Sequence, residues 1–182
     1  MPVLDREDDI DRLLAGAAGC LRRLTVPASI AVVDRGSSDR TVETVDRVMA
    51  RCDVPIRVLG CSAPGWGSAM LRGITTTAAR WVLCGVPEAL LPDVRPGLER
   101  ALRLLRTGDH VVSIATEECG GALFETSVAM LLFGEQLPDE PLLLPEVKDV
   151  PGHAGIRSVT LAAEMREAED GDRYAVLEMV AR

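Results

Sequence analysis

The chain has 182 residues and a mass of 19.5 kDa, a size at which one domain can bury its core without disulfide or metal staples. Hydrophobic residues make up 47% and charged residues 26%, which excludes a disordered chain, and the net charge of -8 disfavours nucleic acid as a partner. No apolar run reaches the roughly 18 to 20 residues of a membrane-spanning helix, and the acidic N-terminus is unlike a signal peptide. We therefore expect one cytoplasmic domain over residues 1–182.

The first two thirds of the chain alternate between helix and strand patterns. Apolar residues recur every three or four positions from Ile10 to Leu24 and predict a helix that ends before Pro27. Short apolar runs bounded by turn residues predict strands at 29–33, 55–59, 81–84 and 110–114. Helical patterns separate these runs. Such alternation is typical of βαβ units, so we expect an α/β fold with a mostly parallel sheet and helices on both faces.

The alternation stops after Gly120. Residues 124–133 are predicted to be helical, and residues 137–151, which hold four of the eleven prolines, are predicted to form an irregular surface loop. A helical pattern resumes near the C-terminal end.

Three turns follow predicted strands at the edge where open parallel sheets bind ligands, namely 34–38, 63–69 and 85–93. Asp34 ends a buried strand, and its carboxylate can accept hydrogen bonds from a nucleobase or ribose, or it can serve as a turn or helix-capping acid. Gly65 and Gly67 precede a helix and would let the backbone approach a diphosphate, although a plain tight turn has the same pattern.

The order of these segments resembles the family 2 glycosyltransferases of GT-A fold, in particular their polyprenyl- or dolichol-phosphate mannosyltransferase branch. The most specific match is residues 31–41, AVVDRGSSDRT, which are similar to the family motif V-V-D-D-G-S-x-D-x-T. Residues 2–7 resemble the family's P-x-x-N-E motif, and residues 65–73 resemble its G-x-G-x-A…G turn and helix. Residues 81–93 resemble the strand and the P-[DE] that frame the metal motif. Residues 149–157 resemble D-x-T…G-F-R, and residues 173–179 resemble the G-Y-x-F-x-x-E-M helix.

The resemblance implies a three-layer α/β/α fold and a site for a nucleotide-diphosphate sugar. In that site Asp34 would face the base, the backbone from Pro2 to Leu4 would lie beside it, and Gly65 and Gly67 would lie near the sugar or phosphates. Relatives transfer the sugar with inversion, in this branch to a lipid phosphate, and use a divalent cation such as Mg²⁺ or Mn²⁺ to neutralise the departing diphosphate.

The sequence departs from the family at the metal and phosphate positions. Where the family has D-x-D, this chain has Gly85-Val86-Pro87-Glu88, so Glu88 is either a relocated metal ligand or a solvated loop acid. The second acid of the D-D-G-S motif is Arg35, whose guanidinium suits a phosphate and would partly replace a metal ion.

The acceptor side of the expected site retains few functional groups. Asp149 is a candidate proton acceptor or a plain loop acid, and Arg157 either holds an acceptor phosphate or begins a solvated helix. These residues are the catalytic candidates.

Three functional hypotheses follow. The first is a glycosyltransferase with weak, altered or metal-independent transfer, and the second is a degenerate non-catalytic domain that acts through a protein partner or by dimerising. The third is a repurposed enzyme with Cys84 as nucleophile, although buried cysteines are usually inert. Pro2 corresponds to the end of the family's first strand, so most of that strand is missing, and a second subunit would cover the resulting gap in a homodimer.

Overall fold

A computed structural model describes residues 1–85, 95–115, 120–135, 158–167 and 173–180. The strands are β1 (Pro2–Val3), β2 (Ile30–Asp34), β3 (Ile56–Gly60), β4 (Trp81–Gly85), β5 (Val111–Ala115), β6 (Gly120–Glu125), β7 (Ser158–Glu167) and β8 (Arg173–Val180). The helices are α1 (Ile10–Leu21), α2 (Thr41–Met49), α3 (Trp66–Thr75), α4 (Arg95–Thr107) and α5 (Thr126–Glu135). The strands and helices predicted up to β5 are therefore confirmed.

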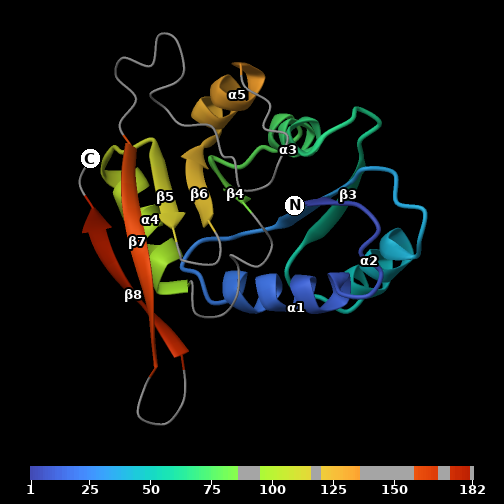
Figure 1. Cartoon of the computed structure of the whole chain (residues 1–182), viewed down its shortest axis with the longest axis horizontal. Helices are drawn as coiled ribbons and strands as arrows, with labels where there is room; N and C mark the ends of the chain where they lie inside the picture. The colour runs from blue at the N-terminus through green and yellow to red at the C-terminus, as the bar shows by residue number, and fades with distance from the viewer. Residues whose placement is uncertain (86–94, 116–119, 136–157, 168–172, 181–182) are drawn as a thin grey trace.

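The described strands form two sheets (Figure 1). The first has the order β1-β2-β3 and is entirely parallel. The second has the order β4-β6-β5-β7-β8, in which β5 and β7 are parallel and β6 runs antiparallel to both β4 and β5. This α/β architecture confirms the predicted fold class. Strand β1 has two residues.

Helices cover both faces of each sheet, as the alternation of side chains along single strands demonstrates. Val32 of β2 packs in one cluster with α1 and α2, whereas the next residue, Val33, lies against Gly73 of α3. In β6, Leu123 packs with α4, whereas Phe124 packs with α3 and α5. Since successive side chains of a strand point to opposite faces, each sheet lies between two helical layers.

The prediction of a helix over residues 124–133 was wrong at its start. Residues Gly120–Glu125 form β6, and helix α5 begins only at Thr126. The segment is apolar on both sides of this boundary, so no change of period marks it. Tertiary contacts determine the boundary instead: the Thr126 amide donates to the Arg80 carbonyl at 2.9 Å, and the Thr126 hydroxyl donates to the Ala79 carbonyl at 2.7 Å.

The prediction of a helix near the C-terminal end was also wrong. The chain there forms β7 and β8, which pair antiparallel from Thr160↔Val180 to Glu167↔Arg173. Residues such as Ala, Leu, Glu and Met favour a helix locally, but pairing of β7 with β5, far away in the sequence, overrides that preference. The predicted loop at 137–151 lies outside the described residues.

Candidate functional site

The carboxyl ends of three parallel strands meet at one edge of the first sheet. Val3 of β1 pairs with Asp34 of β2, and Asp34 pairs with Gly60 of β3, so the loops that follow these strands leave the sheet side by side. The Arg35 amide donates to the Val3 carbonyl at 3.0 Å, and the Cys61 amide donates to the Asp34 carbonyl at 2.8 Å. This edge is the place where open α/β sheets bind ligands.

Asp34 is half-buried at this edge and organises the turn that follows it. Its carboxylate accepts hydrogen bonds from the Gly36 amide at 3.2 Å, the Ser37 amide at 3.1 Å and the Ser37 hydroxyl at 2.6 Å. Asp34 is therefore a turn acid, which is one of the two roles that its position predicted. A carboxylate has about four lone-pair sites, so three donors leave room for one donor of a ligand.

The loop after β1 and the loop after β2 are held together by reciprocal hydrogen bonds. The Asp5 amide donates to the Ser37 hydroxyl at 3.0 Å, and the Asp5 carboxylate accepts from the Ser38 amide at 2.7 Å. Farther along, the Glu7 carboxylate accepts from the Arg40 amide at 2.9 Å, and the Glu7 amide donates to the Asp39 carboxylate at 2.9 Å. These contacts fix the two loops as one unit.

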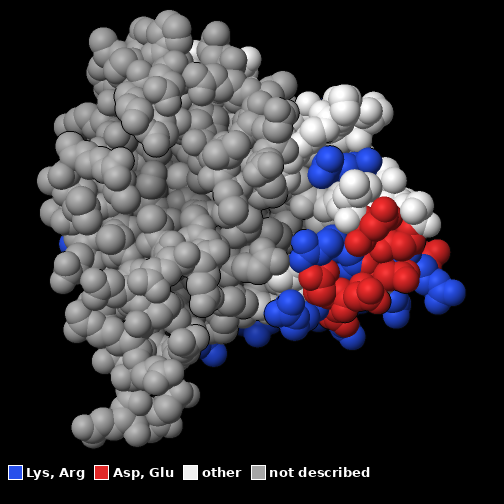
Figure 2. All heavy atoms as spheres, viewed as in Figure 1, with Lys and Arg blue, Asp and Glu red and all other residues white. Residues whose placement is uncertain are grey.

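The bridging roles of Asp5 and Glu7 were not predicted from the sequence. Two features of the sequence could have indicated these contacts, namely the acidic run at the N-terminus and the Ser- and Asp-rich turn of the second loop. Figure 2 shows Asp and Glu side chains gathered with Arg side chains on the side of the molecule that carries α1 and α2. Acidic and arginine side chains therefore lie together on this part of the surface.

Arg35 has an unusual environment for an arginine. Its Nε atom is buried and has no hydrogen-bond partner within the described part of the chain. A buried guanidinium N–H without an acceptor is costly, so an oxyanion would satisfy it. Arg35, which stands where the family motif has an acid, therefore places a cationic group next to Asp34 in the chain. The Nε–H of this group has no acceptor among the described residues.

Gly65 and Gly67 begin helix α3. Gly65 caps the helix at φ 88° and ψ 156°, a conformation that only glycine adopts without strain, and Gly67 is buried in the first turn. No side chain of the described residues caps this helix end, and its first turn contains no acidic residue. Its free backbone N–H groups and the positive end of the helix dipole can therefore bind an anion.

The two other residues expected at the ligand differ in accessibility. Pro2 is buried in β1, so its side chain is not available to a ligand. Leu4 follows β1 and is 41% exposed, so it is the apolar surface of this loop that a ligand can reach.

The remaining predicted site residues, Glu88, Asp149 and Arg157, lie outside the residues that the structure describes. Within the described ranges, no group of three or more His, Cys, Asp or Glu side chains is arranged to hold a metal ion. The metal role of Glu88 therefore stays a prediction.

The Cys84 thiol does not fit the role of a nucleophile. It is 1% exposed, and burial raises its pKa to about 12. At neutral pH it is a protonated, inaccessible thiol that packs with Trp66 and Phe124. The structure therefore opposes the hypothesis that this cysteine carries repurposed chemistry.

Comparisons with known proteins identify the fold. No protein-family model and no curated protein matches the sequence. The structure is similar to the mannosyltransferase PcManGT from Pyrobaculum calidifontis, solved with GDP-Man and Mn²⁺, with a TM-score of 0.65 and 18% identity over 87% of this chain. The chain has a GT-A-like fold.

Two further solved structures share this GT-A-like fold. Glucosyl-3-phosphoglycerate synthase from Mycobacterium tuberculosis, solved with UDP, matches with a TM-score of 0.60 and 19% identity over 93% of this chain and 72% of its own. The 4-diphosphocytidyl-2C-methyl-D-erythritol synthase from Anaerococcus prevotii matches with a TM-score of 0.58 and 12% identity over 87% of this chain and 81% of its own. The chain spans 52% of PcManGT and 34% of Staphylococcus aureus TarS.

The described residues include no helix that is both long enough and apolar enough to cross a membrane.

Proposed function

We propose that this chain binds a nucleotide-diphosphate sugar at the carboxyl edge of β1, β2 and β3. The proposal rests on the arrangement at this edge. Hydrogen bonds join the Asp34 turn to the loop after β1. The turn that follows β3 at the same edge leads to the N-terminus of α3, which no side chain of the described residues caps. Proteins of similar fold have been solved with GDP-Man and with UDP, which supports this ligand class.

Each part of the ligand has a matching group. The remaining acceptor site of Asp34 suits a donor on the ribose or base, and exposed Leu4 offers an apolar contact beside it. The unpartnered Nε of Arg35 and the N–H groups at the start of α3 suit the diphosphate. Arg35 thereby supplies part of the positive charge that a divalent cation would otherwise provide.

The reaction we propose, from the family resemblance, is inverting sugar transfer at a weak or altered rate. An acceptor oxygen forms a bond to the anomeric carbon from the face opposite the diphosphate, the bond from that carbon to the diphosphate oxygen breaks, and the nucleoside diphosphate leaves with its electron pair. Asp149 as proton acceptor and Arg157 as holder of an acceptor phosphate remain proposals, as does the lipid-phosphate class of acceptor.

The proposal is tested by titrating the protein with GDP, UDP, GDP-mannose and UDP-glucose, each with and without Mn²⁺, in calorimetry and thermal-shift assays. A ligand at 100 times its dissociation constant adds about 2.7 kcal/mol to the free energy of unfolding, which is a clear shift of the midpoint. We expect binding of at least one nucleotide, and we expect Asp34→Asn to weaken it about tenfold or more, because the substitution removes a charged acceptor.

Asp39→Asn is the matched control, since Asp39 makes the same kind of hydrogen bonds in the same loop but next to α2. If both variants lose binding equally, loosening of the loop is the cause and the direct role of Asp34 is rejected. If no nucleotide shifts the midpoint of the wild type, the ligand class itself is wrong.

A second candidate function is a non-catalytic domain that acts through a protein partner. It is favoured by the charge reversal at Arg35, where the family motif has an acid. Nucleotide binding without transfer from either sugar nucleotide to water or to a phosphate acceptor would support this candidate over the transferase.

A further inference from the structure

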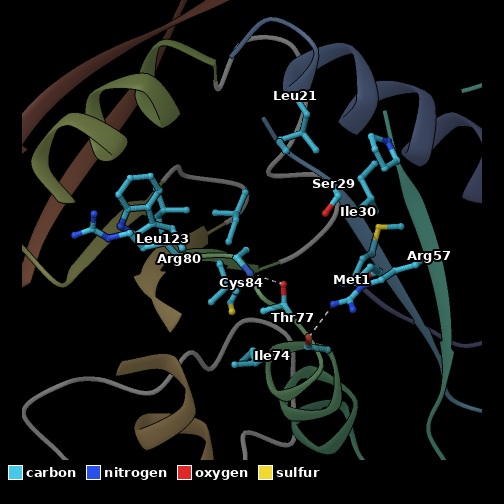
Figure 3. Close-up of a pocket in the computed structure, with 18 of the residues that line it drawn as sticks. Met1, Leu21, Ser29, Ile30, Arg57, Ile74, Thr77, Arg80, Cys84 and Leu123 are labelled. Atoms are coloured by element: carbon cyan, nitrogen blue, oxygen red, sulfur yellow. Dashed lines mark hydrogen bonds between the residues drawn. The ribbon is translucent and has the colours of Figure 1, made fainter. Parts of the chain in front are cut away.

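A cavity of about 680 Å³ lies between β2 and β4 (Figure 3). Met1, Arg57 and Cys84 are among the described residues that line it, whereas Asp34 and Ser37 are not. The cavity is therefore distinct from the edge where the loops after β1, β2 and β3 meet. Selection of a ligand at that edge depends on the hydrogen-bonding groups of these loops, above all on the Asp34 carboxylate.

The two oxygens of the Asp34 carboxylate are used unequally within the chain. Oδ1 accepts hydrogen bonds from the Ser37 amide at 3.1 Å and from the Ser37 hydroxyl at 2.6 Å. Oδ2 accepts from the Gly36 amide at 3.2 Å and shares the Ser37 amide hydrogen over a longer distance of 3.3 Å. Each carboxylate oxygen has about two lone-pair sites, so Oδ1 is full and Oδ2 keeps one site for a ligand.

The Ser37 hydroxyl occupies Oδ1 because its own orientation is fixed. An ionised carboxylate has no hydrogen to give, so the hydroxyl donates its single hydrogen to Asp34. The hydroxyl oxygen in turn accepts a hydrogen bond from the Asp5 amide at 3.0 Å. The Ser37 side chain thus links the loop after β1 to the Asp34 carboxylate.

Asp5 holds this link from the first loop. Its φ of 48° lies in the left-handed region, and no other residue of the described ranges except glycine has a positive φ. The Asp5 carboxylate accepts from the Ser38 amide at 2.7 Å and from the Ser38 hydroxyl at 3.2 Å. Backbone conformations of this kind persist where surrounding contacts fix them, and they cluster at binding sites. The Asp34 carboxylate therefore cannot rotate to free Oδ1 unless these contacts break.

The nucleobases differ in the donors that they present to one free acceptor. Uracil has a single donor on its pairing edge, the N3–H group, with a carbonyl on either side. Guanine has two adjacent donors there, N1–H and the N2 amino group, which together require both oxygens of a carboxylate. Cytosine and adenine have an amino donor beside a ring nitrogen, whose lone pair would face the carboxylate. One free site on Oδ2 therefore suits uracil best.

We propose that the bound nucleotide is a uracil nucleotide and that Ser37 is the residue that selects it. Because Ser37 fills Oδ1, guanine would leave one of its two adjacent donors without a partner, which weakens binding at a half-buried site. The inference rests on the proposed function and names the base that Asp34 contacts. Since Ser37 acts through Asp34, it is a positioning residue.

The test is calorimetric titration of the full chain with UDP, GDP, CDP and ADP in the same buffer and at the same Mn²⁺ concentration. We expect UDP to bind about tenfold or more tightly than each of the others. Ser37→Ala opens a second acceptor site on Oδ1, so guanine can then pair with both oxygens. The preference for UDP over GDP should therefore fall about fivefold or more. Simple loosening of the loop would weaken both nucleotides alike and leave the preference unchanged.

Two further variants serve as controls. Ser38→Ala removes a hydroxyl of the same turn that donates to Asp5 instead of Asp34, so it should keep the wild-type preference for UDP over GDP. Ser37→Thr keeps a hydroxyl at the selecting position and should also keep this preference. Thermal midpoints establish that each variant is folded, and if Ser37→Ala does not fold, the order of affinity of the four nucleotides for the wild type still decides the question.

The outcomes distinguish this inference from the proposed function. If none of the four nucleotides binds, nucleotide binding is wrong and the inference falls with it. Equal binding of all four would mean that Asp34 contacts the ribose, which would overturn the inference and leave the proposed function standing. Tighter binding of GDP, CDP or ADP than of UDP would reject uracil as the base. An unchanged preference for UDP in Ser37→Ala would reject Ser37 as the selecting residue.

Discussion

At the scale of single residues, Gly65 illustrates a local requirement that the candidate site imposes. Its φ of 88° and ψ of 156° place the backbone in a region that L-residues avoid, although a Cβ atom would meet no neighbour within 4 Å. We expect Gly65→Ala to lower the free energy of unfolding by about 1 to 3 kcal/mol through backbone strain. Gly19→Ala is the control: Gly19 lies in α1 with equal space around it, so the change should stabilise the protein by about 0.5 to 1 kcal/mol. Urea denaturation measures both, and equal effects would contradict the strain argument.

At the scale of secondary-structure elements, helix α5 packs against β6, the strand that directly precedes it. Phe124 and Phe133 are 1% and 0% exposed, and their rings meet edge to face with centroids 6.0 Å apart. We expect Phe133→Ala to reduce the free energy of unfolding by about 3 to 5 kcal/mol, because it leaves a cavity under β6. Leu131→Ala on the same helix should cost less than about 0.5 kcal/mol, since Leu131 is 43% exposed. Similar losses in the two variants, measured by denaturant unfolding, would mean that α5 does not pack on β6 in this way.

At the scale of the whole molecule, charge governs how stability depends on pH. Hydrogen bonds from Arg6 and from Arg22 lower the pKa of Asp9 and of Asp53, respectively. Groups with a lowered pKa in the folded state contribute stability above their unfolded pKa, about 3.8, and this contribution is lost as the pH falls through the folded pKa. Self-repulsion of the net charge of -8 acts in the opposite direction, because it weakens as the pH falls toward the pI of about 4.8.

We therefore expect the thermal midpoint to change little or to rise between pH 7 and the pI, and to fall steeply in stronger acid. Asp9→Asn should be less stable than the wild type at pH 7, and the difference should disappear when the pH is low enough to protonate Asp9 in the folded protein. Calorimetric scans of both proteins over this range measure the effect. A difference that persists in strong acid would show that the Arg6–Asp9 pair is not its source.

Local patterns in the sequence were sufficient for the elements from α1 to β5 and for the turn acid Asp34, because hydrophobic periodicity and turn residues act over a few neighbouring positions. They did not reveal β6, which ends where Thr126 donates hydrogen bonds to Ala79 and Arg80, and they did not predict that the C-terminal segment forms β7 and β8. The bridging of Asp5 to the loop after β2 spans more than 30 positions and was equally invisible. The division of the described strands into two sheets, with a cavity between β2 and β4, could not be predicted from the sequence, because strand pairing joins residues that are distant in the chain.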